Sequence, residues 1–412
     1  MAGNLVSAIE IGTSRTAMAA GRAAAGGGVE LLAFAEQETT GMRKGRVVEP
    51  DYVARAVRTV RESVEGQLSG GGAIIDAALV CNLGEISCDP VSAEVPVTGD
   101  EGRVCAEDVE KALDAMLAAV PEAPDREPLG DAIALYYALD GKGEEIFEPQ
   151  DMVAEKLSAF GMAMSVDLNA YAALADAAGE GGVKSNLDMF SALASATAVL
   201  SPQQKEDGAL CLNLGGGTTS YCAYHRRHPI AAGALPVGGD HVTNDLLSAF
   251  KPGSTMLANR LKIECGRADP EAVAPEASVR MPDDGSLSVR TVGERAVAQV
   301  VHARLDETFR LVRADLEAKG VLPWLGGGIV LVGGAAKTPG VRALASRVFG
   351  APCALATLGT GFQVLDRDPL RNATIWGALC RAVEYERRLE SRNASGGVRR
   401  FFKNLFSREG AE

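Results

Sequence analysis

The chain has 412 residues, 47% of them hydrophobic, which is typical of a packed protein of roughly two to four domains and not of a disordered chain. Its 41 Lys and Arg against 54 Asp and Glu give a net charge of −13, the wrong sign for general binding to nucleic acid, so we expect no nucleic-acid partner. The eight cysteines contain no C-x-x-C pair, and we find neither a secretory leader nor a long apolar run. We therefore expect a cytoplasmic protein without a zinc ribbon, a disulfide framework or a membrane span.

The first part of the chain predicts a β-meander followed by a helix. Residues 5–22 predict two strands around a glycine turn at 12–14, and residues 29–34 predict a third strand. Between residues 51 and 67, apolar side chains recur at spacings of three and four, which indicates an amphipathic helix. A strand at 74–80 is expected next.

Residues 84–165 have a different character and are interpreted as an inserted small α/β module. Within this block we expect a helix at 106–120, a proline-rich connection at 121–128 and a strand at 132–137. After it, the apolar residues 188–200 predict a helix that Ser-Pro closes.

A pattern near the start of the chain occurs again about 200 residues later. Both 8–14 and 211–220 have an apolar strand, a polar residue, an apolar residue, a glycine turn and then hydroxyl side chains. So long a period excludes a solenoid and favours two similar α/β halves. A third glycine site lies in 326–340, where a buried-type strand ends in a Gly-Gly turn before a helix from about Pro339, and a long helical stretch covers 371–388.

These glycine sites suit a nucleotide. Two facing hairpins present backbone N–H groups and hydroxyls to one point, as the β- and γ-phosphates require, although neither has the lysine of a P-loop. The turn at 333–337 lets the backbone approach a base or ribose, because glycine has no Cβ. A plain tight turn explains any one of these sites; the ordered set of three favours nucleotide binding.

The chain resembles the FtsA family of bacterial cell-division proteins, within the actin-like ATPase superfamily. Besides the three glycine motifs, the resemblance rests on the runs at 41–48, 137–141, 192–200 and 235–246, the last of which contains GG-D-x-V-T-x-D. The block 84–165 sits where that family carries its distinctive subdomain. The resemblance implies a two-lobed actin-like (ribonuclease H-like) α/β fold with an inserted small α/β subdomain and a C-terminal amphipathic helix.

The resemblance also implies the division of the chain. In the first lobe we expect subdomain 1A at 1–83 and 166–196, with the inserted subdomain 1C at 84–165. In the second lobe we expect subdomain 2A at 197–228 and 319–365, with subdomain 2B at 229–318. The chain then ends in a return helix to 1A at 366–388, a linker at 389–397 and a membrane-targeting helix at 398–412.

Carried over residue by residue, the resemblance implies a site for ATP with Mg²⁺. The nucleotide-binding residues would be Gly12, Thr13, Ser14, Arg15, Gly215, Gly216, Gly217, Thr218, Thr219, Asn259, Lys262, Gly333, Gly334 and Ala335. Asn259 stands at a position that is usually acidic in the family. Lys262 is either a nucleotide contact or a solvated helix lysine.

Four further residues depart from the family pattern: Glu10, Asn213 and Ser220 replace Asp, and Arg15 replaces Lys. Glu10 and Asn213 are the catalytic candidates, and Glu10 could order Mg²⁺-bound water from a shifted position. Asn cannot accept a proton at neutral pH and adds no negative charge, so it is poor at activating water. We infer ATP binding with slow or absent hydrolysis.

The segment 398–406 predicts a helix that binds an anionic membrane. Its apolar side chains occupy one helix face and its cations the remainder: Val398, Phe401, Phe402, Leu405 and Phe406 against Arg399, Arg400 and Lys403. The alternative is a terminal helix docked on the body or on a partner. One such helix binds reversibly, whereas many on one polymer bind firmly.

The resemblance implies an adaptor at the cytoplasmic face of the membrane, peripheral and at the division site. It would form filaments with itself, bind the C-terminal peptide of the tubulin-like protein FtsZ on residues 229–318, and recruit later division proteins. Three alternatives remain. A pilus-assembly protein of the PilM type should lack the basic aromatic tail, a sugar-kinase-like enzyme would need a catalytic Asp, and an MreB-like protein would lack the insertion at 84–165.

Overall fold

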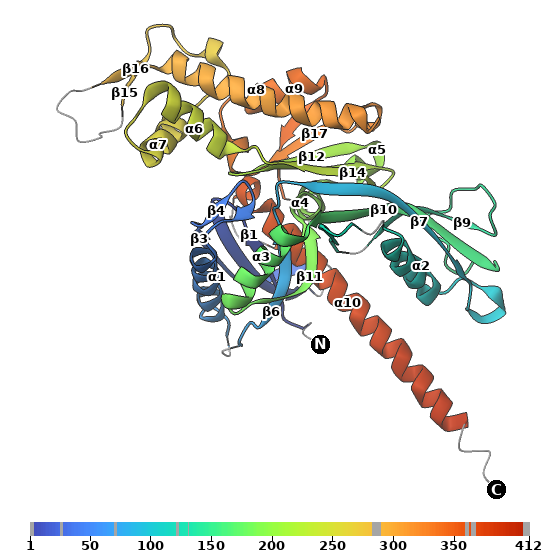
Figure 1. Ribbon diagram of the computed structural model, residues 1–412. Helices are drawn as coiled ribbons and strands as arrows, with labels where there is room; N and C mark the ends of the chain where they lie inside the picture. Colours follow the sequence, from blue (N-terminus) through green and yellow to red (C-terminus); the bar gives the residue numbers. More distant parts are fainter. Residues whose placement is uncertain are drawn as a thin grey trace.

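A computed structural model describes residues 4–24, 28–69, 72–120, 123–130, 132–281, 290–358, 362–363 and 368–406, the side chains at 362–363 and beyond Arg387 excepted. Two lobes, each built on its own sheet, lie one above the other, and a module with a third sheet projects sideways from between them (Figure 1).

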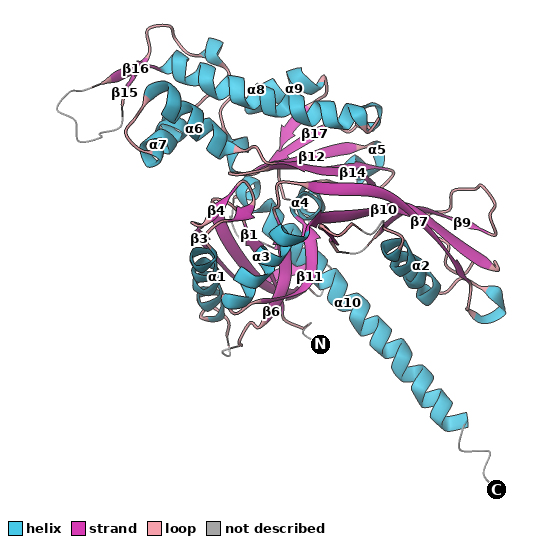
Figure 2. Ribbon diagram, viewed as in Figure 1, coloured by secondary structure: helices cyan, strands magenta, loops and turns pink. Residues whose placement is uncertain are grey.

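The first lobe has a mixed sheet. In spatial order its strands are β11 (Lys184–Phe190), β6 (Asp76–Cys81), β1 (Val6–Ile11), β2 (Arg15–Ala23), β3 (Val29–Glu38) and β19 (Phe362–Gln363). Helices α1 (Pro50–Glu65) and α3 (Leu168–Glu180) pack together on this sheet, while α4 (Ser191–Val199) and α10 (Pro369–Phe406) pack on it nearer the second lobe (Figure 2). Helices on both sides explain why β1 is buried along nearly its whole length and is mostly apolar.

The second lobe repeats this plan. Its sheet has the order β14 (His228–Leu235), β13 (Thr219–His225), β12 (Ala209–Leu214), β17 (Ile329–Val332) and β18 (Cys353–Leu355). In both lobes a first strand pairs antiparallel with the next one along the chain and parallel with a later one: β1 with β2 and β6, and β12 with β13 and β17. The repeated sequence pattern therefore corresponds to a repeated topology.

Helices extend the second lobe at one end. These are α6 (Gly239–Phe250), α7 (Thr255–Cys265) and α8 (Glu294–Ala318), with a small hairpin of β15 (Ser278–Arg280) and β16 (Thr291–Gly293), while α9 (Val341–Phe349) packs against α8. The short α5 (Pro202–Asp207) precedes β12.

The module is a sheet covered by one helix. Strand β10 (Lys156–Asp167) pairs with β7 (Ile86–Pro96), β8 (Arg126–Pro128) and β9 (Ile133–Leu139), and α2 (Ala106–Ala118) packs on β7 and β10. It has its own hydrophobic core, which includes Val104, Met116 and Leu157. The helix and strand expected at 106–120 and 132–137 are present within a residue or two.

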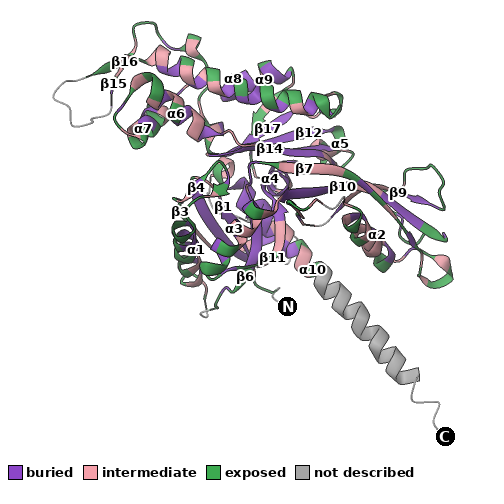
Figure 3. Ribbon diagram, viewed as in Figure 1, coloured by how far each residue is buried: buried purple, intermediate pink, exposed green. Residues whose placement is uncertain are grey.

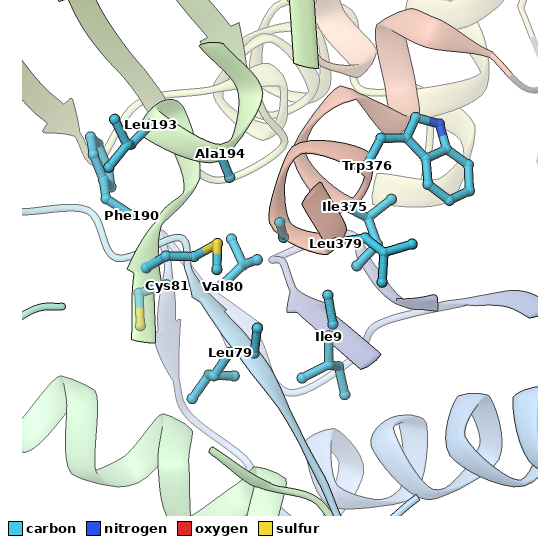
Figure 4. Packing of buried hydrophobic residues seen from close by; sticks show 14 of the residues in the cluster. Ile9, Leu79, Val80, Cys81, Phe190, Leu193, Ala194, Ile375, Trp376 and Leu379 are labelled. Atoms are coloured by element: carbon cyan, nitrogen blue, oxygen red, sulfur yellow. The ribbon is translucent and has the colours of Figure 1, made fainter. Parts of the chain in front are cut away.

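The core of the first lobe extends into the junction between the lobes, where α4 and α10 cross. Figure 4 shows Ile375 and Leu379 of α10 beside Ile9 of β1. Gly377 makes this crossing possible, since a Cβ there would collide with the carbonyl oxygen of Ala194 in α4. The central strands of the two lobe sheets, such as β1, β12 and β17, together with α4, are almost entirely buried (Figure 3).

Two expected elements differ from the structure. Residues 188–190 were expected to be helical but end strand β11, because Asp188, Met189 and Phe190 pair in parallel with Leu79, Val80 and Cys81. The backbone of α10 is continuous across 389–397, where a linker was expected. Glycine lowers helix stability by only about 1 kcal/mol per residue and keeps its N–H donor, so Gly-Gly does not force a break.

Candidate functional site

The two hairpin turns predicted to hold phosphates lie against each other at the lobe junction. A side chain at Gly216 would collide with Ser14 Oγ, and one at Gly217 would collide with Thr13 Oγ1. Glycine at position 217 is therefore required for the close approach, and glycine at position 216 leaves room for the Ser14 hydroxyl. The backbone and hydroxyl groups of the two turns meet at one point.

The family-like run at 41–48 supports this contact from the first lobe. It forms a small hairpin of β4 (Met42–Arg43) and β5 (Arg46–Val47). The N–H of Gly45 donates to Thr13 Oγ1 at 3.1 Å. Gly45 has a φ of +78°, and a Cβ there would crowd the backbone at 82–84 and the methyl group of Thr218. The turn at Gly45 therefore contacts both glycine hairpins, through Thr13 and Thr218.

The start of α6 holds the second hairpin. The N–H groups of Gly239 and Asp240 donate to the carbonyl oxygens of Gly215 and Gly216 at 2.9 and 2.8 Å. Lys262 Nζ in α7 donates to the Gly239 carbonyl oxygen at 3.0 Å. The first two bonds satisfy the carbonyl groups of Gly215 and Gly216, and the third ties Lys262 to the start of α6.

Lys262 is not a solvated helix lysine. Its Nζ also donates to Thr243 Oγ1 at 2.7 Å, and burial lowers the pKa of Lys262 while the charge of Asp240 opposes the shift. A half-buried ammonium beside the glycine turns is suited to an anionic ligand. Asn259, on the same helix, is exposed.

The third glycine motif lies beside the second. Gly333 has a φ of +91°, and a Cβ there would lie 2.6 Å from Asn213 Oδ1. Its N–H donates to the carbonyl oxygen of Leu370 at 2.7 Å. Gly334, by contrast, has open space around it, and Ala335 packs near Gly239. The chain then forms a 3-10 turn, Gly334–Lys337, before α9 begins at Val341. The structure thus brings all three motifs and Lys262 together.

Arg15 is directed differently from our expectation. Its guanidinium donates to Glu10 Oε2 at 2.7 Å, to Glu36 Oε2 at 2.9 Å and to Asn372 Oδ1 at 2.5 Å. It also donates to the carbonyl oxygen of Arg371 at 2.9 Å. With these partners engaged, Arg15 holds protein groups and is not a phosphate ligand in this arrangement.

The two catalytic candidates do not fit a Mg²⁺ ion. The carboxylate of Glu10 is bound by Arg15 and also accepts from Asn82 Nδ2 at 3.4 Å. Asn213 turns its Nδ2 to the hydroxyls of Ser195 and Thr374. Across the described residues, no group of three or more His, Cys, Asp or Glu could hold a metal ion. A resident Mg²⁺ at Glu10 would have to displace a buried ion pair.

Comparison with known proteins agrees with this architecture. A sequence model described as "Cell division protein FtsA" matches residues 210–374, and one described as "SHS2 domain inserted in FTSA" matches residues 84–164. The chain belongs to the FtsA family. The inserted module of β7 to β10 and α2 is the family's SHS2 domain.

Curated FtsA-family proteins align with most of the chain. Cell division protein FtsA of Pseudomonas aeruginosa is 28% identical over 353 residues, covering 86% of this chain and 83% of that protein. Cell division protein FtsA of Escherichia coli K12 is 29% identical over 353 residues, covering 84% of this chain and 82% of that protein.

Solved structures share the fold. The PilM-PilN type IV pilus biogenesis complex matches with a TM-score of 0.59 and 15% identity, over 92% of this chain and 98% of that one. MreB5 of Spiroplasma citri bound to ADP matches with a TM-score of 0.54 and 13% identity, over 94% and 98%. Identities this low show the actin-like fold alone.

The predicted membrane-binding side chains at 398–406 lie outside the part of the chain whose side chains the structure describes. Among the described residues, no helix has the length and apolar content needed to cross a membrane.

Sequence reasoning missed four residues that bond to the site, namely Glu36, Ser195, Asn372 and Thr374. They come from β3, α4 and α10 and belong to no glycine motif. Ser195 lies in the family-like run 192–200, but nothing in the local sequence of the other three distinguishes them from ordinary polar positions.

Proposed function

We propose that this FtsA-family protein is an ATP-binding, filament-forming adaptor that tethers FtsZ to the cytoplasmic membrane and helps recruit later division proteins. The observation that carries the proposal is the convergence of three glycine motifs and Lys262 at the lobe junction of an FtsA-family chain. The ADP-bound MreB5 of like fold supports a nucleotide as the ligand. The nucleotide residues retained in the proposal are the two glycine turns, Lys262 and the turn at 333–335.

Hydrolysis should be slow or absent. Asn213 cannot serve as a base, and Glu10 is neutralised by a buried guanidinium. Under this proposal the nucleotide favours one arrangement of the lobes and thereby filament formation, and turnover is secondary.

Membrane binding is assigned to residues 398–412, at the end of the helix that begins in the lobe junction. Each cation contributes at most about 1 kcal/mol near anionic lipid, so a single chain should bind reversibly. Filaments would add many such contacts at high effective concentration. ATP should therefore strengthen membrane binding through polymerisation.

The test is co-sedimentation with anionic vesicles, with and without ATP, of the full chain and of a chain ending at Gly397. The full chain should pellet with the vesicles, more so with ATP, and the shortened chain should stay in the supernatant. A full chain with Phe401→Ser and Phe402→Ser keeps every cation and should lose most binding, which separates apolar insertion from charge attraction. If every form stays soluble in all conditions, the segment is a protein-docking helix and the adaptor proposal fails.

FtsZ binding is assigned to the helices that extend the second lobe. Helix α7 exposes two large apolar side chains, Met256 at 75% and Ile263 at 72%, which support docking of a peptide there. Met256→Ser with Ile263→Ser should weaken binding of a labelled FtsZ C-terminal peptide, measured by fluorescence anisotropy. Leu32→Ser, an exposed apolar position on the first lobe, is the matched control and should not change the affinity.

A further inference from the structure

A cluster of uncharged polar side chains lies buried at the junction of the lobes. Its members are Ser191 and Ser195 of α4, Asn213 of β12, Ser220 of β13 and Thr374 of α10, and none is more than 7% exposed. Ser191 Oγ and Ser220 Oγ are 3.1 Å apart. The cluster therefore joins both lobes immediately behind the glycine turns.

The hydrogen bonds of this cluster have a fixed direction. Ser195 Oγ donates its one proton to the carbonyl oxygen of Ser191 at 2.8 Å, so Thr374 must donate across the 2.9 Å contact between Thr374 Oγ1 and Ser195 Oγ. Both hydroxyl oxygens then offer only lone pairs to position 213. Asn213 Nδ2 supplies protons to both, at 3.3 and 3.1 Å.

The directions of these hydrogen bonds favour Asn at position 213. A carboxylate at position 213 would face two oxygens that have no proton left to give, in a buried site where an unpaired charge is costly. The amide therefore fits the network with its hydroxyls in these orientations, whatever its effect on hydrolysis.

The first turn of α10 bonds to the other two motifs as well. Asn372 Oδ1 accepts from Arg15, which follows the first glycine turn, and the carbonyl oxygen of Leu370 accepts from Gly333 of the third motif. Both Asn372 and Thr374 are at least 95% buried. Residues 370–374 therefore contact all three motifs within five positions.

We propose that residues 370–374 form a clamp that fixes the two glycine hairpins relative to each other, with Arg15 and Asn213 as positioning residues of that clamp. The identity of the bound ligand rests on the proposed function above, but the clamp itself exists without ligand. It sets the relative position of the lobes that a nucleotide must fit. Because the clamp is the start of α10, a change in lobe position is transmitted directly to that helix.

The test is amide hydrogen exchange of the nucleotide-free full chain, followed in peptides covering 8–20 and 209–220. Thr374→Val removes the hydroxyl at constant shape, and Asn213→Asp removes the donor; each should speed exchange in 209–220 by about tenfold. Thr374→Ser keeps the hydroxyl and should exchange like the wild type. Asn372→Leu should speed exchange in 8–20, whereas Asn372→Asp keeps an acceptor for Arg15 and should not.

Phosphate release provides the second measurement. Because Glu10 stays paired with Arg15 in this variant, Asn213→Asp alone should not raise phosphate release from ATP if Asn213 is a positioning residue. Unchanged exchange together with faster release would identify Asn213 as a weakened catalytic position and overturn the clamp. Equal exchange in Thr374→Val and Thr374→Ser would overturn it too. A failure of ATP or vesicle binding leaves the exchange result readable, so the two proposals can fail separately.

Discussion

Arg15 donates to Glu10 at 2.7 Å, and each of these charged residues is less than 10% exposed. The pair flanks the turn of the hairpin that is predicted to hold phosphates. A buried ion pair of this sort contributes little net stability but is costly to break, because removal of one partner leaves the other as a buried, unpaired charge. A buried ion pair, in which the charges of Arg15 and Glu10 neutralise each other, therefore lies beside the first glycine turn.

We expect Arg15→Ala to lower the free energy of unfolding by about 3 to 5 kcal/mol, since Glu10 would be left as a buried, unpaired carboxylate. Urea unfolding followed by circular dichroism measures the change. Arg260→Ala, which breaks an exposed helix pair with Glu264, is the matched control and should leave the midpoint unchanged. If the two variants unfold at equal urea concentrations, the Glu10 pair does not hold the hairpin.

Metal removal provides a second prediction. Because Glu10 is engaged by Arg15, the wild-type protein should bind a fluorescent ATP analogue with nearly equal affinity in Mg²⁺ and in excess EDTA. The double variant Glu10→Asp with Arg15→Lys restores the family pattern and should make affinity depend on Mg²⁺. A wild-type protein that loses nucleotide in EDTA would contradict this account of Glu10.

The sequence was sufficient to predict the glycine turns and the helices and strands around them. Glycine at a turn with positive φ, as at Gly333, and apolar periodicity, as in α1, depend only on residues that are close in the sequence, so they can be recognised without the structure. The repeated strand pattern also predicted the repeated topology of the two lobes. The FtsA family followed from these motifs and the inserted module.

The partners of the site side chains could not be predicted. Arg15 bonds to Asn372, 357 positions away, and Asn213 to Thr374, 161 positions away. No periodicity relates residues at such separations, so neither hydrogen bond could be inferred from the sequence, and Arg15 was expected to face phosphate. The strand end at residues 188–190 was missed for another reason, since a continuous apolar run fits a buried strand and a helix equally well.

The SHS2 module contains a pH-sensitive carboxylate. Burial raises the pKa of Asp108, but hydrogen bonds from Thr98 and Cys105 outweigh it and lower the pKa to about 2. Because the folded-state pKa is depressed from its ordinary 3.8, the stabilisation of roughly 2 kcal/mol is present above pH 3.8 and is lost as the pH falls through about 2.

Asp108→Asn should therefore destabilise the protein by roughly this amount at pH 7 and have little effect near pH 2. Thermal unfolding at a series of pH values measures the difference. Asp114→Asn, an exposed position on the same helix, is the control and should track the wild type throughout. A penalty for Asp108→Asn that does not change with pH would show that the hydrogen bonds, and not the charge, carry the effect.

Contact between the two glycine turns provides the last prediction. Gly216→Ala places a methyl group against Ser14 Oγ and 3.1 Å from Ser14 Cβ, so the Ser14 hydroxyl must rotate away and the turns must shift slightly, and both thermal stability and nucleotide affinity should fall. Ser14→Gly in the same chain removes the obstacle and should restore most of the loss in thermal stability, whereas Gly334→Ala meets open space and should be tolerated. The four-way comparison of wild type, each single variant and the double variant isolates the contact. Additive losses would mean that the turns do not touch in solution, and the nucleotide site would then have to form by closure of the lobes.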